Sequence, residues 1–213
     1  MHSSVVYFTQ RVITEDMVKG KVVLEVGAKN VNGSLREWIS TLHPLIYTGT
    51  DMQAGAGVDK IIKAEELTAN FSYGTFNLVI CTETLEHVKE WRKAINNIKD
   101  VLSPDGFILI TARGKEMGYH PYPDDYWRYD TEVIAKIFAD YDIWALEQDT
   151  EYDGVLMLAK KRGEPRIDLK KIELAAVAKV ATDEPEYSDD VASEIIVKDD
   201  IKDYKAEGKI RLH

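Results

Sequence analysis

Cysteine is nearly absent from the 213-residue chain, whose single thiol, Cys81, excludes an intrachain disulfide. No cysteine or histidine spacing around Cys81 is typical of a zinc site, and the sequence predicts no metal ligands. Also missing is any apolar run near the ~20 residues that a membrane-spanning helix needs. Residues 1–4 lack the positive charge and apolar core of a secretion signal. These absences indicate a cytoplasmic protein that does not use the membrane as a partner.

Positive charge is also scarce, since 27 Lys and Arg face 37 Asp and Glu and give a formal net charge of −10. Such a surface repels phosphates, and no extended basic run opposes that repulsion, so nucleic acid is not expected as a partner. The acidity is densest over residues 182–203, which hold nine acids and two lysines.

The hydrophobic pattern alternates between strand-length runs and helix-like segments. The six expected strands are 22–26, 45–47, 76–81, 107–111, 141–146 and 154–159. Amphipathic spacing predicts helices over 33–42, over 91–102 and from Thr131, which is expected to cap the third helix. This alternation favours an α/β fold with a doubly wound, mainly parallel sheet. Because only residues 147–153 separate the last two runs, they are expected to form an antiparallel hairpin at the sheet edge.

The alternation of strands and helices stops after residue 162. We therefore predict one domain over residues 1–162 and an acidic C-terminal extension over residues 163–213. Within the extension, Ile167 to Val180 has the spacing of an amphipathic helix, and the acidic remainder is expected to be partly disordered.

A strand that ends at a glycine gives the first functional signal, at Glu25-Val26-Gly27. Ligands of parallel sheets bind at the carboxyl ends of strands, and a glycine there lets the backbone approach a nucleotide-type ligand. The dinucleotide fingerprint G-x-G-x-x-G is incomplete, because Lys29 stands where its second glycine should be. Glu25 would repel a pyrophosphate but attract a cationic group. The alternative is an ordinary strand-turn-helix connection in which Ser34 caps the helix.

An acid follows the next expected strand, at Asp51, 24 residues after Gly27. A carboxylate at that place can accept both hydroxyls of a ribose. Read alone, Asp51 is more typical of a turn aspartate that caps its own loop. Beside it, Met52 can pack on an adenine face or lie in the core.

Four motifs in order resemble the class I S-adenosylmethionine-dependent methyltransferases, specifically the small type-11-like branch, from about Lys21 to Lys161. The motifs lie at residues 23–27, 47–51, 76–88 and 101–110. The resemblance implies a seven-stranded, Rossmann-like sheet and S-adenosylmethionine as cofactor, with S-adenosylhomocysteine as its product.

The resemblance also implies roles for single residues. Glu25 would face the methionine end of the cofactor, Gly27 would lie beneath it and Asp51 would hold the ribose. Because Lys63 stands where the family often has an adenine-binding acid, Ala64 or Glu65 is expected to take that part. The predicted cofactor-binding residues are Glu25, Gly27, Ala28, Asp51, Met52, Ala64, Glu65, Cys81 and Thr82.

An aromatic loop over residues 117–129 is the expected acceptor site. Its His…Pro…Asp-Tyr-Trp-Arg sequence is similar to one in methyltransferases that modify sugars and glycans. We rank His120 first and His87 second as a general base. The predicted catalytic residues are His120, His87 and Asp124, and the predicted substrate-binding residues are Glu83, Tyr126, Trp127 and Arg128. In the alternative interpretation, Trp127 packs under the next helix and Arg128 pairs with Asp124 or Asp125.

The sequence therefore favours transfer of a methyl group to an oxygen, less readily a nitrogen, of a small polar acceptor such as a sugar or glycan. One alternative is an NAD-dependent oxidoreductase or epimerase, but the chain lacks both the full glycine fingerprint and a Tyr-x-x-x-Lys pair around Tyr126 and Tyr129. Another is a non-catalytic S-adenosylmethionine-binding scaffold. The sequence makes no prediction of oligomeric state.

Overall fold

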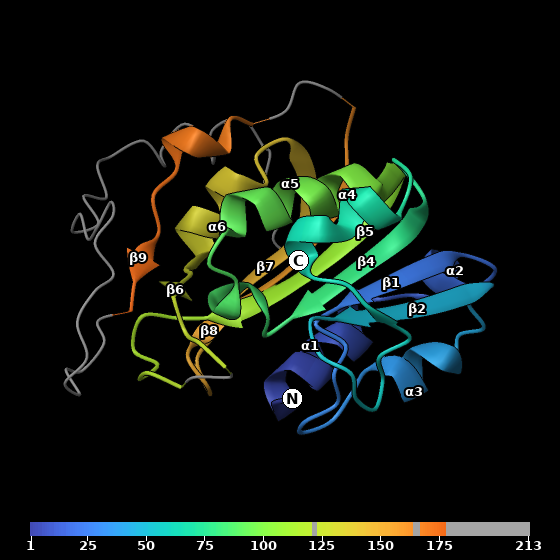
Figure 1. Cartoon of the computed structure of the whole chain (residues 1–213), viewed down its shortest axis with the longest axis horizontal. Coiled ribbons are helices and arrows are strands. Elements are labelled where there is room, and N and C mark those ends of the chain that lie inside the picture. Colours follow the sequence, from blue (N-terminus) through green and yellow to red (C-terminus); the bar gives the residue numbers. More distant parts are fainter. Residues whose placement is uncertain (121–122, 164–166, 178–213) are drawn as a thin grey trace.

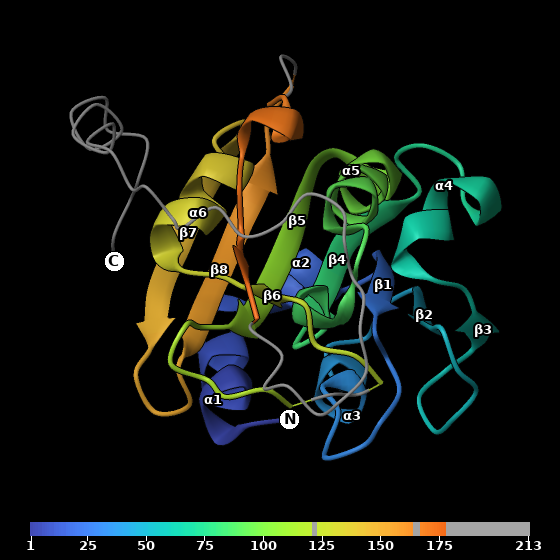
Figure 2. The same ribbon diagram turned by 60° about the vertical axis from the view of Figure 1, so that its left-hand side comes forward.

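A seven-stranded sheet separates two layers of helices in the computed structural model, which describes residues 1–120, 123–163 and 167–177 (Figure 1). Its strand order is β3-β2-β1-β4-β5-β8-β7, which can be followed across Figure 2. The strands of this sheet are β1 Val22–Val26, β2 Ile46–Asp51, β3 Lys60–Ile61, β4 Phe76–Thr82, β5 Leu102–Arg113, β7 Tyr141–Asp149 and β8 Gly154–Lys161. Two further short strands, β6 Trp127–Arg128 and β9 Ala175–Ala176, pair with each other beside it. The predicted doubly wound α/β fold is confirmed.

Helices cover both faces of the sheet. On one face lie α1 Ser3–Val12, α2 Glu15–Val18 and α3 Arg36–Ser40. On the other lie the 3-10 helix η1 Ala64–Glu66 and the helices α4 Leu67–Asn70, α5 Trp91–Val101 and α6 Thr131–Ile137 (Figure 1). Two more 3-10 turns are η2 Leu85–His87, after β4, and η3 Leu169–Lys171.

The sheet builds two cores because successive strand residues point to opposite faces. In β1, Leu24 belongs to the core under α4, α5 and α6, whereas Val23 belongs to the core under α1 and α3. The same alternation places Val79 in the first core and Leu78 in the second. This two-sided burial explains why the strands read as continuous apolar runs in the sequence.

The predicted hairpin is present at the sheet edge. β7 and β8 pair in antiparallel fashion, and β8 also runs antiparallel to β5, so β8 lies inside the edge and β7 forms it. The intervening residues are too few for a crossover helix, which forces the chain to turn straight back.

Two local predictions were wrong. The cap of α6 is Asp130, whose side chain accepts a hydrogen bond from the Val133 backbone at 2.8 Å, while Thr131 is the first helical residue. The expected helix over Ile167 to Val180 is replaced, within residues 167–177, by η3 and β9. Arg92 of α5 donates to the backbone carbonyls of Leu169 and Ile172, and these tertiary bonds occupy carbonyls that a continuous α-helix would pair within itself.

Residues 178–213, including the segment expected to be disordered, lie outside the described residues. Leu169, Ile172 and Leu174 are buried in the core under α5 and α6, so residues 167–177 pack on the domain. The division of the chain at residue 162 stays a prediction. Within the described residues, no helix combines the length and apolar character that crossing a bilayer requires.

Candidate functional site

A cavity of about 670 Å³ opens at the carboxyl ends of β1, β2, β4 and β5, where a parallel sheet binds its ligands. Thirteen of the sixteen predicted site residues line it: Glu25, Gly27, Ala28, Asp51, Met52, Ala64, Glu65, Thr82, Glu83, His87, His120, Asp124 and Tyr126. The other three, Cys81, Trp127 and Arg128, lie outside it. The strand ends therefore gather most of the predicted residues around one space, and their individual roles stay predictions.

Gly27 forms a cradle in the cavity floor that admits no side chain. Its φ of +76° lies in the left-handed region, and a Cβ built there would collide with the side chain of Thr84. The backbone N–H groups of Gly27 and Ala28 both donate to the Thr50 carbonyl, at 2.8 and 2.9 Å. The turn is thus held by β2, and the Thr84 side chain packs against Gly27 in the place that a Cβ would take.

Glu25 brings a carboxylate into the cavity wall from inside β1. It is only 2% exposed, and the Tyr47 hydroxyl donates a hydrogen bond to its Oε2 at 2.7 Å. Burial raises the pKa of Glu25 to about 7, and this effect outweighs the hydrogen bond from Tyr47 and the attraction of Arg36. A cationic ligand group at this position would favour the ionised form.

Asp51 ties two loops of the site together at the end of β2. Its Oδ2 accepts a hydrogen bond from the Lys29 backbone at 3.3 Å, and its Oδ1 accepts one from the Gln53 backbone at 2.9 Å. The Lys29 ammonium donates to the Gln53 side chain at 2.7 Å. The lysine that replaces the second glycine thus joins the same loop, while Met52 is 47% exposed and does not belong to the core.

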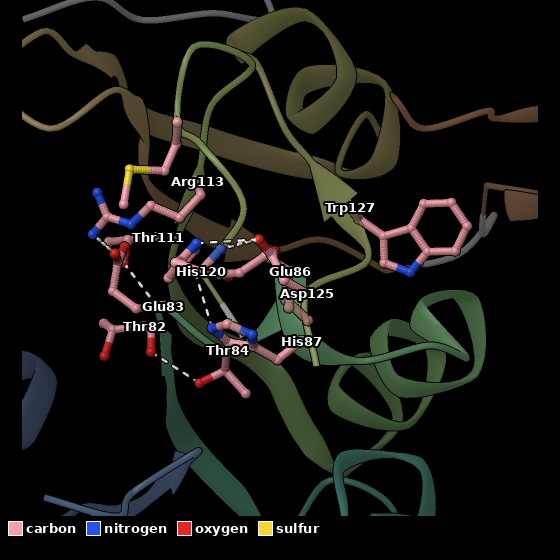
Figure 3. A network of polar contacts seen from close by, with 12 residues as sticks. Thr82, Glu83, Thr84, Glu86, His87, Thr111, Arg113, His120, Asp125 and Trp127 are labelled. Carbon is pink, nitrogen blue, oxygen red and sulfur yellow. Dashed lines mark hydrogen bonds and ion pairs between the residues drawn. The ribbon is translucent and has the colours of Figure 1, made fainter. Parts of the chain in front are cut away.

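The opposite part of the cavity carries two imidazoles. The rings of His87 and His120 meet edge to face with centroids 5.1 Å apart, and Figure 3 shows them beside Glu86 and Asp125. Nδ1 of His87 lies within hydrogen-bond distance of the Asp124 backbone carbonyl. Burial lowers the pKa of His87, so the neutral imidazole is favoured.

Glu83 stands between the two parts of the cavity with a strained backbone, at a φ of +50°. Its Oε1 accepts a hydrogen bond from the Thr111 hydroxyl at 2.7 Å, and its Oε2 forms an ion pair with Arg113 (Figure 3). The carboxylate is therefore anchored to the end of β5. A substrate would meet an ion pair here rather than a lone negative charge.

The three residues outside the cavity contact other parts of the protein. Cys81 is fully buried in the core under α4, α5 and α6, which also contains Val79, and burial raises the pKa of its thiol. The Trp127 indole donates to the backbone carbonyl of Val88 at 3.0 Å and packs on the core.

Arg128 is 4% exposed and makes two bonds to Asp125, of 2.5 and 2.6 Å. It also donates to the backbone carbonyls of Met117 and Gly118. Asp125 and this loop thus occupy the guanidinium that was predicted to bind a substrate, and that role stays a prediction. The alternative pairing with Asp125 is confirmed.

Several residues of the cavity were not predicted from the sequence, among them Met1, His2, Lys29, Asn32, Thr84 and Arg113. Arg113 had a usable signal, because it ends the fifth strand of the sheet at the same edge as Glu25 and Asp51. Met1 and His2 had none, because only the packing of α1 brings the start of the chain to this edge.

Comparison with known proteins identifies a family. The family model described as a methyltransferase domain matches residues 10–147. No curated protein shows a significant match to the chain.

Solved structures share the architecture. The Burkholderia thailandensis 1,6-didemethyltoxoflavin-N1-methyltransferase, solved with bound 1,6-didemethyltoxoflavin and S-adenosylhomocysteine, is 14% identical with a TM-score of 0.55. That match covers 68% of this chain and 72% of the other. A SAM-dependent methyltransferase from Aquifex aeolicus is 18% identical with a TM-score of 0.51, over 68% of this chain and 84% of the other. An S-adenosylmethionine-dependent methyltransferase from Mesorhizobium loti is 15% identical with a TM-score of 0.51, over 71% and 95%. At these identities the likeness shows a common fold.

Proposed function

The chain belongs to the methyltransferase domain family, as a class I enzyme that uses S-adenosylmethionine, and from this premise we propose that it methylates an oxygen of a small polar acceptor. The observation that carries the proposal is the single cavity in which Gly27, Glu25 and Asp51 lie at one part and His87 and His120 at another. One cavity can therefore hold a methyl donor and an acceptor together.

The residues of β1 and β2 fit the cofactor. The Gly27 turn places backbone in the cavity wall, and Glu25 offers a carboxylate to the cationic methionine end. Asp51 stands at the end of the neighbouring strand, where it can accept the ribose hydroxyls, and Met52 and Glu65 line the wall toward the expected adenine. Bound there, the cofactor supplies an electrophilic methyl group on its sulfonium.

The residues around the two imidazoles fit an acceptor that must lose a proton. Methyl transfer is an in-line displacement, so holding the acceptor aligned and free of water supplies much of the catalysis. A hydroxyl also needs help with its proton, and the imidazoles of His87 and His120, which both line the cavity, can give that help. We propose that His120 acts on the acceptor hydroxyl, with Asp124 next to it in the cavity wall.

The acceptor is proposed to be sugar-like because the wall near the histidines is polar. Glu83, Asp124 and Tyr126 line it and can bind hydroxyl groups, and the Tyr126 backbone N–H donates to the Glu86 carbonyl at 2.8 Å, in the 3-10 turn that carries His87. Transfer to nitrogen is the second candidate, since the Burkholderia thailandensis protein of the same fold is an N1-methyltransferase.

A methyl-transfer assay with labelled S-adenosylmethionine tests the proposal. Monosaccharides and polyols would be compared with amines of similar size, and the His120→Ala variant would be assayed beside the parent protein. We expect methyl transfer to a hydroxyl compound, with turnover in His120→Ala lowered 100-fold or more by the loss of proton transfer. Cofactor binding without turnover on any acceptor would favour the non-catalytic scaffold, and transfer to amines alone would overturn the assignment of oxygen.

A further inference from the structure

Glu86 is a carboxylate with no evident role in the site described so far. It lies in η2, directly after β4, and is fully buried. Within the part of the chain that the structure describes, neither of its side-chain oxygens has a hydrogen-bond partner. A buried carboxyl without partners is costly, and such groups are normally satisfied by a donor or a cation.

Two histidines stand next to this carboxylate. His87 Nε2 lies 4.0 Å from Glu86 Oε1, and His120 comes from the loop after β5. One potential ligand atom from each of the three residues lies within 4.8 Å of the other two. Ligand atoms on one tetrahedral ion with bonds of about 2.1 Å are roughly 3.4 Å apart, so a small contraction of the loop would complete the set.

The Nδ1 atoms of both histidines face oxygen atoms. Nδ1 of His87 lies within hydrogen-bond distance of the Asp124 backbone carbonyl, and Nδ1 of His120 lies 3.2 Å from Asp125 Oδ2 without the alignment of a hydrogen bond. When Nδ1 carries the proton that such acceptors require, the lone pair of Nε2 is left for a ligand bond. Histidines that bind metals usually donate their other N–H to a carbonyl or carboxylate in this way.

The second of these acceptors is itself fixed. Asp125 is 3% exposed and receives two bonds from Arg128, of 2.5 and 2.6 Å, as well as the His120 backbone N–H at 2.9 Å. Arg128 therefore fixes Asp125, and Asp125 in turn positions His120 by accepting its backbone N–H. This explains why Arg128 is turned away from the cavity.

We infer that Glu86, His87 and His120 form a binding site for a divalent transition-metal ion at the floor of the acceptor part of the cavity. Two imidazoles and one carboxylate suit Zn²⁺, Co²⁺, Mn²⁺ or Fe²⁺, whereas Mg²⁺ and Ca²⁺ prefer oxygen ligands alone. Three protein ligands leave at least one coordination position open, as in catalytic rather than structural sites. The sequence did not predict this site, because its three residues include no cysteine and one of them lies 33 positions from its neighbour.

The open position faces the cavity, since His87 and His120 both line it. A cation there binds the acceptor oxygen and lowers the pKa of its O–H group. The O–H proton leaves to water, the oxygen forms a bond to the methyl carbon, and the carbon–sulfur bond breaks with its electron pair remaining on sulfur. This catalytic role of the ion rests on the proposed methyl transfer to an oxygen. In it the ion, and not His120, promotes the loss of the acceptor proton. Binding of the ion itself depends neither on methyl transfer nor on proton abstraction by His120.

A neutral Glu86 is the competing explanation of the buried carboxyl. Burial raises its pKa to about 8, and the nearby Asp125 adds to the effect, so without a cation Glu86 would stay protonated at neutral pH. The two explanations differ in what Glu86→Gln does. Glutamine reproduces a neutral carboxyl in shape but is a poor ligand for these ions.

Calorimetric titration of the chelator-treated full chain with Zn²⁺ and with Co²⁺ tests the inference, with the visible absorption of bound Co²⁺ as a second readout. We expect one ion per chain, and at least tenfold weaker binding in each of Glu86→Gln, His87→Asn and His120→Asn. His43→Asn is the matched control, because His43 is exposed, lies outside the cavity and has a φ of 56°, which asparagine tolerates. The fold of each variant would be checked by its unfolding midpoint.

Absence of stoichiometric binding in the parent chain would overturn the inference, and so would equal binding in parent and Glu86→Gln. Zinc bound by surface histidines would give equal binding in the parent and in Glu86→Gln, because a buried carboxylate does not take part in such binding. Methyl transfer that persists at full rate after chelation would leave the proposed function intact and remove the ion from it. Ion binding without S-adenosylmethionine binding would support the metal site and overturn the proposed function.

Discussion

The Tyr47 hydroxyl donates a hydrogen bond to the Glu25 carboxylate at 2.7 Å, from β2 to the adjacent β1. Glu25 lines the cavity and is almost fully buried, and Tyr47 contacts it from the neighbouring strand. The bond holds the carboxylate in place, yet burial still raises its pKa to about 7. Glu25 is therefore poised to change its charge near neutral pH.

The first prediction is that S-adenosylmethionine affinity depends on the charge of Glu25. The cationic methionine end favours the ionised form, so binding below pH 7 must remove a proton from Glu25. Affinity should rise about tenfold from pH 6 to a plateau near pH 8. Calorimetry would measure it in the parent, in Glu25→Gln and in the exposed control Glu37→Gln. The same pH profile in Glu25→Gln as in the parent would contradict the assignment.

Stability should respond to the same group with the opposite sign. Because the folded pKa of Glu25 is raised above its ordinary value of 4.5, the folded state binds more protons than the unfolded state between pH 4.5 and 7. The free energy of unfolding should therefore fall as pH rises through this window, by up to about 3 kcal/mol. Urea unfolding of the cofactor-free chain measures the slope, which Glu25→Gln should remove.

A further prediction concerns Gly27, where both backbone conformation and space require glycine. Gly27→Ala should destabilise the fold by about 1–2 kcal/mol from the positive φ, more if Thr84 cannot move aside, and should weaken cofactor binding at least tenfold. Gly163→Ala is the control, since no atom lies within 4 Å of a Cβ built there. Equal behaviour of the two variants would show that the Gly27 turn is not a cradle.

Asp51 is predicted to bind the ribose. Asp51→Ala should weaken S-adenosylmethionine binding by 10- to 100-fold, the effect of one or two charge-assisted hydrogen bonds. Because Asp51 also accepts two backbone N–H groups, the unfolding midpoint must be measured alongside, with the exposed Asp16→Ala as reference. Unchanged affinity in a folded Asp51→Ala protein would refute the ribose assignment.

The pair Arg128–Asp125 is predicted to stabilise the acceptor loop. Arg128→Met leaves Asp125 buried without its partner and should cost about 3–5 kcal/mol in urea unfolding. Arg162 makes a similar pair with Asp142, but both side chains are about 40% exposed, so Arg162→Met should cost less than about 1 kcal/mol. If Arg128→Met were as mild as Arg162→Met, the loop would not depend on this pair.

Much of this fold could be predicted from the sequence because apolar periodicity and strand-end glycines are local signals. The same local signals placed Glu25, Gly27 and Asp51 at one edge, since carboxyl ends of parallel strands meet there. The face of the sheet to which each strand residue points was harder to predict. Cys81 and Thr82 are neighbours in β4, yet only Thr82 faces the cavity, because alternate residues point to opposite sides.

Burial of charged groups could not be predicted from local pattern. Arg128 reads as a surface residue in a polar loop, and only the folded chain shows that Asp125 and backbone carbonyls enclose it. Glu86 likewise reads as one more acid of an acidic protein, whereas η2 turns it into the interior. Tertiary contacts decide such positions, and they join segments far apart in the sequence.

Calorimetric titration of the full chain with S-adenosylmethionine, with S-adenosylhomocysteine and with NADH decides which cofactor the cavity binds. We expect one binding site per chain for each of the first two compounds, weakened in Asp51→Ala, and no binding of NADH. Binding of NADH without either S-adenosyl compound would overturn the assignment of the cofactor.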